Sequence, residues 1–354
     1  MAIIPICYSG AMRLTIRSVQ VEAFDAPLKR PFVTALGRKT SSPNVGVVVR
    51  LSDGAEGYGE ASSSLALKHL SQRALARALA RTGAWARGRD ASRPGELIET
   101  AWERLEGVSP AAAAFESALL AAVCASRGVS LREWLGAARR ELETDITISA
   151  WDEAATSEAV KEARGEGFRR YKVKVGGAFA EDLARVRAVR RACPNARILL
   201  DGNQGLTPGG ALRLVEASLK EGPVELLEQP LPKDQLSRMP ALARRCPVPI
   251  ALDESVATPA DAVRAVDLGA CGAINIKLAK SGLTRALRIA SIARAAGLKL
   301  MIGCMAETAA GLDASVALAM GTGFFSFVDL DSDHLLKPGG RPAAFTRRGP
   351  ALSV

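Results

Sequence analysis

The sequence is poor in histidine and in aromatic side chains. Of its 354 residues two are histidines, His69 and His334, and 5% are aromatic. Histidine is the usual acid–base side chain near neutral pH, so proton chemistry here must come mostly from lysines and carboxylates. The net charge of +10 permits nucleic-acid contact, but the basic residues are spread over expected helices at 73–87 and 184–191 without interleaved aromatic residues. This pattern is typical of solvated helix faces and not of a nucleic-acid interface.

Paired cysteines and long apolar runs are lacking as well. The six cysteines are scattered and form no CxxC pair, which argues against a disulfide framework or a zinc site and predicts reduced thiols in a cytoplasmic protein. No uninterrupted apolar run reaches the roughly 18 residues that a membrane span requires. Residues 1–12 lack the basic start and long apolar stretch of a secretory signal, so we expect a disordered leader there.

The rest of the sequence divides into two regions that differ in their pattern of apolar and polar residues. Residues 13–60 alternate apolar and polar side chains like antiparallel strands, with a loop expected at 27–42. Residues 67–137 have the Ala/Leu spacing of helices. We expect these segments to form an α+β capping domain over residues 13–143.

From about residue 145 onward, short apolar strands alternate with helical segments. The strands are expected at 146–151, 170–175, 197–203, 225–230, 249–255, 273–278, 298–304 and 325–331. Eight such units in a row predict an α/β architecture, a (β/α)8-type barrel over residues 144–331. No GxGxxG follows an early strand, which argues against an open doubly wound sheet. The tail at 332–354 is expected to pack back on the capping domain.

Three of the expected barrel strands end in a carboxylate: Asp201, Glu228 and Asp253. Taken singly, each could cap a helix or belong to a turn. Consecutive parallel strands end at the same rim of a barrel, where active sites form, so the three acids converge and repel one another unless a cation neutralises them. Mg2+ prefers such hard oxygen ligands, and we predict one Mg2+ per subunit at this rim.

Lysines flank these acids in the sequence. Lys172 and Lys174 share one face of the second strand, and Lys277 ends the sixth. A solvated edge strand would also explain an isolated KxK, but the neighbouring acids favour lysines that point into the barrel. Two amines on opposite faces of one carbon can exchange its proton with inversion, because one removes the proton while the other returns it.

The combined pattern resembles the muconate-lactonizing-enzyme subgroup of the enolase superfamily, over nearly all of residues 13–335. In that superfamily a lysine or histidine base works with Mg2+, which stabilises an enediolate. The resemblance implies that the three acids bind Mg2+ and that Lys174 and Lys277 form the acid–base pair. It also implies that Lys172 lies beside the substrate carboxylate.

The last expected strand narrows the substrate class. Asp329 and Asp331 lie two apart in VDLDSD and share a face, and a pair of inward acids suits an ammonium group. Such a DxD is similar to that of the dipeptide epimerases, where it grips the α-ammonium, and the segment at 303–308 is similar to their seventh strand. The resemblance implies three further substrate neighbours: Cys304, Met305 and Glu307.

One position departs from the alanyl-glutamate epimerases, which carry an arginine in the first domain for the side-chain carboxylate. Gly37 stands where that arginine aligns, and Arg38 would serve with a shift of one residue. Extra acids, namely Asp333, Glu60 and Glu307, favour a neutral or basic side chain. We therefore predict an isomerase, a Mg2+-dependent dipeptide epimerase. We expect it to prefer a neutral or basic side chain over glutamate at the inverted carbon.

Other activities on the same scaffold stay open. They are alanyl-glutamate epimerase, N-acylamino acid racemase, o-succinylbenzoate synthase and muconate cycloisomerase. The substrates of the last three carry no α-ammonium and would leave Asp329 and Asp331 without a role. A basic binding protein without catalysis would leave the lysine–acid–lysine pattern unexplained. We expect a dipeptide as partner and a homo-oligomer in the cytoplasm, with neither nucleic acid nor membrane.

Overall fold

The first part of the chain forms a long antiparallel sheet. The computed structural model describes residues 14–62, 64–67 and 69–354, so the leader expected at 1–12 lies outside the described residues. Three strands pair in the order β1-β2-β3, and their bounds are Ile16–Thr34, Gly37–Leu51 and Glu56–Ser62. The loop predicted at 27–42 is wrong, because β1 and β2 continue through it as a hairpin. The sequence pattern favoured a loop because Pro27 and Pro31 lie in the second half of β1, and proline is unusual within strands.

Four helices follow this sheet in the chain, and the first and third of them pack against it. They are α1 (Gln72–Ala86), α2 (Pro94–Arg104), α3 (Ser109–Ser126) and α4 (Leu131–Trp134), after a short 3-10 turn at Leu65–Leu67. Helix α3 approaches β3 so closely that a Cβ on Gly57 or Gly59 would overlap its backbone. By length and hydropathy α3 could cross a membrane, but 78% of it is buried within the protein, as in the core helix of a globular domain.

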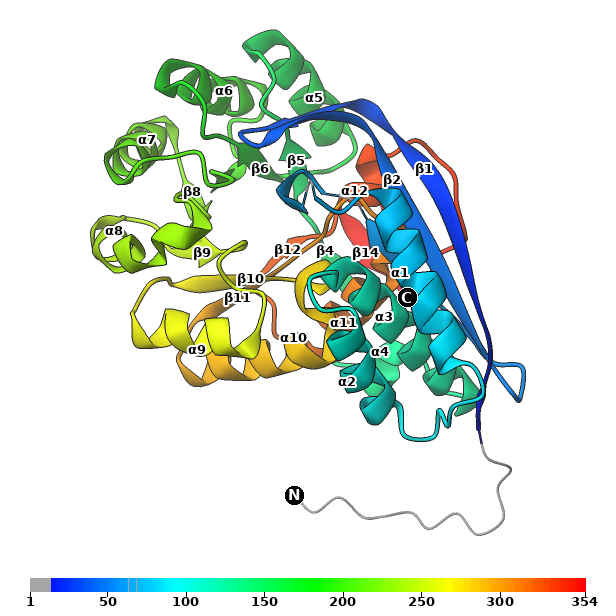
Figure 1. The fold of residues 1–354 in the computed structure, drawn as a ribbon. Helices are drawn as coiled ribbons and strands as arrows, with labels where there is room; N and C mark the ends of the chain where they lie inside the picture. The colour runs from blue at the N-terminus through cyan, green and yellow to red at the C-terminus, as the bar shows by residue number, and fades with distance from the viewer. Residues whose placement is uncertain (1–13, 63, 68) are drawn as a thin grey trace.

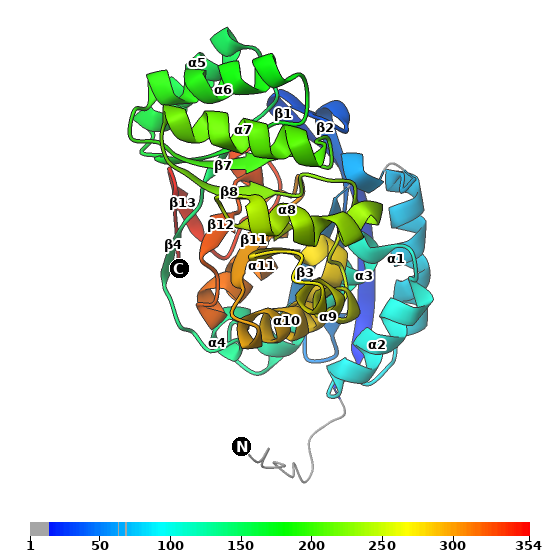
Figure 2. The ribbon, with the colours of Figure 1, turned by 90° about the vertical axis from the view of Figure 1, so that its left-hand side faces the viewer.

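Eight parallel strands form the second part of the chain, in the order β12-β11-β10-β9-β8-β7-β6-β5. The strands are β5 (Ile146–Ile148), β6 (Arg170–Lys174), β7 (Arg197–Asp201), β8 (Val224–Glu228), β9 (Ile250–Leu252), β10 (Ala273–Lys277), β11 (Lys299–Gly303) and β12 (Phe327–Asp329). Helices surround them on the outside, and the capping sheet with its helices lies to one side (Figures 1 and 2). The predicted barrel with a capping unit is confirmed.

Helices connect successive strands of the barrel, and one short helix follows the last strand. They are α5 (Glu153–Gly165), α6 (Phe179–Ala192), α7 (Pro208–Glu221), η2 (Lys233–Arg238), α8 (Met239–Arg245), α9 (Pro259–Asp267), α10 (Leu278–Ala295), α11 (Ala309–Thr322) and α12 (Ser332–Leu335). An apolar cluster fills the inside of the barrel, formed by Leu199, Leu226, Ala251, Ala273, Met301 and Phe327. Polar side chains on the same strands lie further toward their carboxyl ends, which places the site at that end of the barrel.

The first and last barrel strands meet at a seam. The Asp145 amide donates to the Val328 carbonyl at 2.9 Å, and the Leu330 amide donates to Thr144 Oγ1 at 2.8 Å. The Thr147 amide donates to the carboxylate of Asp331 at 2.6 Å, so a side chain takes the place of a strand carbonyl. These bonds join β5 to the segment around β12 and bring the two ends of the barrel sequence together.

The C-terminal segment is held by both parts of the molecule. Strands β13 (Thr346–Arg348) and β14 (Ala351–Ser353) form a small antiparallel sheet with β4 (Glu141–Glu143). Leu336 forms an isolated bridge with Leu28 of β1. The segment after the last barrel strand therefore contacts both the capping sheet and the linker that enters the barrel.

Candidate active site

The two lysines of β6 point into the barrel. Lys172 and Lys174 alternate along the strand with Tyr171 and Val173, which pack in the apolar core. Strand β6 pairs with β5 on one side and β7 on the other, so it is not an edge strand. Both lysines are buried, and a buried ammonium group requires anionic partners.

The three predicted acids lie at one rim. Asp201 and Glu228 are the last residues of β7 and β8, and Asp253 directly follows β9. The register sets Lys174 beside Asp201 and Asp201 beside Glu228. All three carboxylates are buried at the barrel mouth, as the strand ends predicted.

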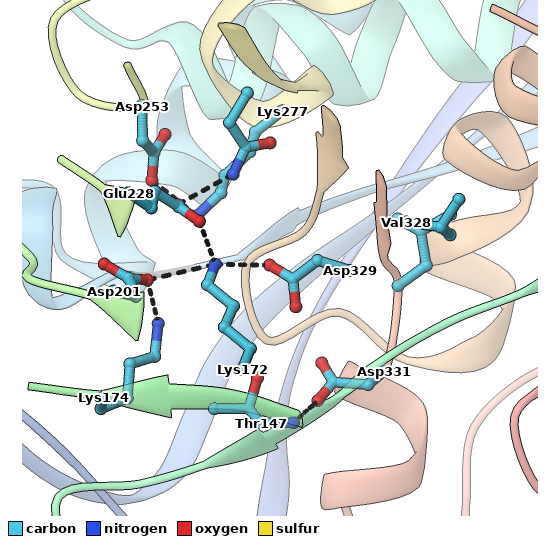
Figure 3. A network of polar contacts seen from close by, with 12 residues as sticks. Thr147, Lys172, Lys174, Asp201, Glu228, Asp253, Lys277, Val328, Asp329 and Asp331 are labelled. Carbon is cyan, nitrogen blue, oxygen red and sulfur yellow. Dashed lines mark hydrogen bonds and ion pairs between the residues drawn. The ribbon is translucent and has the colours of Figure 1, made fainter. Parts of the chain in front are cut away.

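Lys172 lies at the centre of the acidic groups (Figure 3). Its Nζ is 2.6 Å from Asp329 Oδ2, 2.8 Å from Glu228 Oε2 and 3.1 Å from Asp201 Oδ2. One ammonium group thus offsets the charge of carboxylates from three strands. The predicted role of Lys172 beside the substrate carboxylate stays a prediction, and in this structure its ammonium group contacts carboxylates of the protein.

The other two lysines lie on opposite sides of this centre (Figure 3). Lys174 Nζ donates to Asp201 Oδ2 at 2.6 Å, and Lys277 Nζ is 2.8 Å from Asp253 Oδ2. Strands β6 and β10 are separated by three strands in the sheet, so the two amines approach from different directions. A substrate carbon between them would have one amine on each face.

Burial and ion pairing act against each other on these groups. Burial alone would raise the pKa values of Asp201 and Asp253, but Lys174 and Lys277 outweigh it and hold both below their usual range. Burial, together with repulsion from Asp201, raises the pKa of Glu228 to about 7. The three acids therefore differ in proton affinity although they share one rim.

Lys280 is a member of the site that the sequence reasoning missed. It lies in the first turn of α10, and its Nζ donates to Asp253 Oδ1 at 2.7 Å and to the Asn275 carbonyl at 3.1 Å. The available signal was its position three residues after Lys277, in the first turn of the helix that begins where β10 ends. Asn275 also donates to Glu228 Oε1 at 2.9 Å and so orients that carboxylate.

Several oxygen atoms at the rim fit a divalent cation. Within the part of the chain that the structure describes, Glu254 Oε2 and Asn203 Oδ1 are buried and accept no hydrogen bond, whereas Glu228 Oε2 is paired with Lys172. Asn203 and Glu254 line the main cavity beside the predicted ligand Asp253. Unpaired buried oxygens are costly, and an ion such as Mg2+ satisfies them. The donor set is therefore suited to a hard metal ion.

Asp329, the last residue of β12, and Asp331, two residues beyond the strand, are also buried at this mouth. Asp329 accepts from Lys172, and Asp331 accepts from the Thr147 amide. Among the described residues, Asp145, Asp329 and Asp331 are three carboxyl groups of which one oxygen each lies within 4.8 Å of the other two. The predicted metal ligands do not form such a group, and the Lys172 ammonium group contacts two of them, Asp201 and Glu228.

A cavity of roughly 230 Å3 lies between the barrel mouth and the capping unit. Lys174, Lys277, Asp329 and Asp331 line its floor, and Cys304 and Met305 line it as the sequence predicted. Apolar side chains of the capping unit form much of the opposite wall: Leu28, Phe32, Leu36, Leu65 and Leu67.

The predicted contacts in the capping hairpin are shifted by one residue. Lys39 lines the main cavity, whereas Arg38 lines a separate shallow cavity beside Trp151 and Glu158. Neighbouring residues of a strand point to opposite sides, which explains the exchange. Burial lowers the pKa of Lys39 to about 8, against the opposing effect of Glu307.

Glu307, predicted as a substrate neighbour, is not among the described residues that line the main cavity. Its carboxylate accepts from the Met305 amide at 2.8 Å. Burial, with repulsion from Glu60, raises the pKa of Glu307 to about 8. The structure thus places Glu307 in contact with the wall residue Met305.

Comparison with known proteins agrees with this architecture. Residues 155–348 match the model of the family described as "Enolase C-terminal domain-like". The chain belongs to the enolase superfamily, in the mandelate racemase/muconate-lactonizing group. The predicted relationship is confirmed.

The curated relatives and solved structures of this group include several dipeptide epimerases. An aromatic dipeptide epimerase from Herpetosiphon aurantiacus is 34% identical over 97% of both chains. An L-Ala-D/L-Glu epimerase from Thermotoga maritima is 35% identical over 92% of this chain and 94% of its own. A dipeptide epimerase from Methylococcus capsulatus, solved with Mg and L-Arg-D-Lys, is 34% identical, with a TM-score of 0.89 and coverage of 96% and 97%.

Proposed function

We propose that this chain is a Mg2+-dependent dipeptide epimerase that inverts the α-carbon next to the C-terminal carboxylate. The observation that carries the proposal is the pair of buried amines, Lys174 and Lys277, on opposite sides of a carboxylate-lined centre. The relatives named above, which are epimerases of dipeptides, support the same reaction class.

The metal site would use the three acids at the strand ends. Asp201, Glu228 and Asp253 would hold one Mg2+ per subunit, and the unpaired oxygens at the rim support this assignment. When bound, the ion supplies positive charge that stabilises the enolate formed from the substrate carboxylate. Lys172, buried among the same acids, would face that carboxylate and stabilise the developing charge electrostatically.

The lysine pair would carry the proton. One amine removes the α-proton from its side of the carbon, and the ammonium group of the other delivers a proton to the opposite face. Either direction gives the inverted epimer, and the reverse reaction uses the same two groups with exchanged roles. The apolar capping wall at Leu36 and Leu65 would exclude water during this transfer.

Asp329 and Asp331 would bind the α-ammonium of the dipeptide. Both carboxyl groups line the cavity floor, and Asp331 is fixed by the Thr147 amide at 2.6 Å. Fixed carboxylates form strong charge-assisted hydrogen bonds with an ammonium group. A substrate with an acylated amine would lose this interaction, which favours free dipeptides over N-acylamino acids.

For the side chain at the inverted carbon we propose a neutral, mainly apolar preference. The capping wall is largely apolar, and the Lys39 ammonium group in the cavity would repel a basic side chain. The acids that suggested a basic preference have partners within the protein. Asp333 accepts from Arg347 Nε at 2.8 Å and Glu60 accepts from Asn44 at 2.7 Å.

The test is deuterium incorporation at the α-carbon in heavy water with Mg2+, using L-Ala-L-Leu, L-Ala-L-Lys and L-Ala-L-Glu. We expect the leucine dipeptide to exchange and epimerise fastest. Lys174→Ala and Lys277→Ala should each lower epimerisation by roughly 10²- to 10⁴-fold, and each should retain exchange with one epimer only, the two being complementary.

Three outcomes would contradict these statements. Fastest turnover of the glutamate or lysine dipeptide would overturn the neutral preference alone. Loss of exchange with both epimers in each single lysine variant would overturn the two-base reaction. Exchange of N-acylamino acids but of no dipeptide would overturn the epimerase assignment itself.

A further inference from the structure

Asp145 is a fully buried carboxyl group that the reaction above does not use. It directly precedes β5, its exposed fraction is 0%, and neither of its carboxyl oxygens has a hydrogen-bond partner among the described residues. A buried carboxylate without donors loses its hydration and gains nothing in return. Its retention at this position therefore requires a neutral form or a bound cation.

The surroundings of Asp145 are acidic. One of its carboxyl oxygens lies within 4.8 Å of one oxygen of Asp329 and one of Asp331, across the barrel seam. Lys172 is the cation that acts on it, and this ammonium group is already shared among Asp329, Glu228 and Asp201. Three buried carboxylates at this spacing repel one another too strongly for all to be ionised.

The backbone prevents Asp145 from moving away. Its amide donates to the Val328 carbonyl at 2.9 Å, and the neighbouring Thr144 hydroxyl accepts from the Leu330 amide at 2.8 Å. Burial and repulsion by Asp329 and Asp331 raise the pKa of Asp145 well above its usual value. Asp145 is thus the member of the cluster that keeps its proton, since Asp329 has Lys172 at 2.6 Å and Asp331 has the Thr147 amide.

We propose that Asp145 is a positioning residue whose carboxylic acid donates a hydrogen bond to Asp329 and holds that carboxylate toward the α-ammonium of the substrate. The inference rests on the proposed function, because it assumes that Asp329 binds the substrate ammonium. Lys172 holds Asp329 from one side and Asp145 from the other, so the carboxylate is fixed by two donors.

The kinetic test compares two substitutions at one position. Asp145→Asn keeps the size of the side chain and offers an N–H donor to Asp329, whereas Asp145→Ala offers none. We expect Asp145→Ala to raise KM for L-Ala-L-Leu by roughly 10- to 100-fold, the usual effect of losing a hydrogen bond to a charged group, with a smaller change in kcat. We expect Asp145→Asn to restore most of the affinity.

A substrate without the ammonium group separates positioning from general damage. Propionyl-L-leucine has the shape of L-Ala-L-Leu but no amine, so its binding, measured by competition, should be unchanged in Asp145→Ala. The matched control is Asp313→Asn, a carboxylate on α11 that accepts from the Ala344 amide at 2.7 Å. An equal loss of affinity for L-Ala-L-Leu and for propionyl-L-leucine in Asp145→Ala would overturn the proposal. Equal KM values for L-Ala-L-Leu in Asp145→Ala and Asp145→Asn would also overturn it.

An infrared measurement tests the protonation without turnover. The difference between the wild-type and Asp145→Asn spectra at neutral pH should show one carbonyl band of a protonated carboxylic acid, which this subtraction separates from the bands of other protonated carboxyl groups such as Glu307. Absence of the band in the wild type would overturn the proposal. So would loss of the band when Mg2+ is added to the double variant Asp201→Asn, Asp253→Asn, because that result would show that a cation binds at Asp145. If the band is present but no dipeptide is epimerised, the proposed function is wrong, whereas the hydrogen bond from the Asp145 carboxylic acid to Asp329 remains supported.

Discussion

At the residue scale, the site combines ionisable groups whose proton affinities are separated by their neighbours. Lys172 and Lys174 stabilise the charge of Asp201, whereas Asp331 lies beside another carboxylate. Burial, with repulsion from Asp329, raises the pKa of Asp331 to about 6. The environment of each carboxyl group, and not its residue type, therefore decides whether it is charged near neutral pH.

A pH dependence of substrate affinity follows for Asp331. Its pKa is raised, so it gains a proton as the pH falls through about 6 and loses its attraction for the substrate ammonium. We expect KM for L-Ala-L-Leu to rise by roughly 10- to 100-fold below that pH, measured by initial rates over the range. Propionyl-L-leucine, measured by competition, is the control and should show no such rise. A pH-independent KM for the dipeptide would contradict the role of Asp331.

At the element scale, helix α3 of the capping unit is joined to α10 of the barrel through one buried carboxylate. Glu116 of α3 accepts from the Thr284 amide at 2.7 Å and from Trp102 Nε1 at 2.8 Å, and also from the Thr284 hydroxyl. Gly282, at φ 61°, lies so close that a Cβ there would overlap the Glu116 carboxylate. These contacts fix the capping unit against the helix that follows Lys277.

Removing this carboxylate should loosen the contact between the two parts. We expect Glu116→Ala to lower the free energy of unfolding by about 2–4 kcal/mol, because several buried donors lose their acceptor. The measurement is urea unfolding followed by tryptophan fluorescence, with Glu99→Ala, an exposed surface pair of Arg288, as control. Exposed pairs contribute little, so the control should change stability by less than about 1 kcal/mol. Equal effects of the two variants would contradict the role of Glu116.

At the scale of the whole molecule, the barrel brings carboxylates of separate strands to one rim and depends on cations to hold them there. The structure shows lysine ammonium groups among them. A cation that binds the folded chain and not the unfolded one stabilises the folded state by mass action.

Mg2+ alone should therefore raise the thermal midpoint of the wild type in proportion to the logarithm of its concentration. At a Mg2+ concentration one hundred times Kd, the free energy of unfolding should increase by about 2.7 kcal/mol. Asp253→Asn should lose most of this response in differential scanning fluorimetry, and a chelator should reverse it in the wild type. An equal response in the variant would show that Mg2+ binds elsewhere.

The amino-acid order by itself determined the barrel and the main residues of the site. Strands that recur with helices between them can close only a few architectures, and alternation along a strand decides which lysines share a face. Acids at the ends of neighbouring parallel strands must meet at one rim. These local rules were sufficient to find Lys174, Asp201, Glu228, Asp253 and Lys277.

The tertiary structure alone decided which distant segments lie next to this rim. Asp145 precedes the first barrel strand and meets Asp329 of the last strand only because the barrel closes. Lys39 replaces Arg38 in the cavity because the segment predicted as a loop is a hairpin with fixed alternation. Such contacts depend on closure and docking of separate elements, which no local pattern in the sequence specifies.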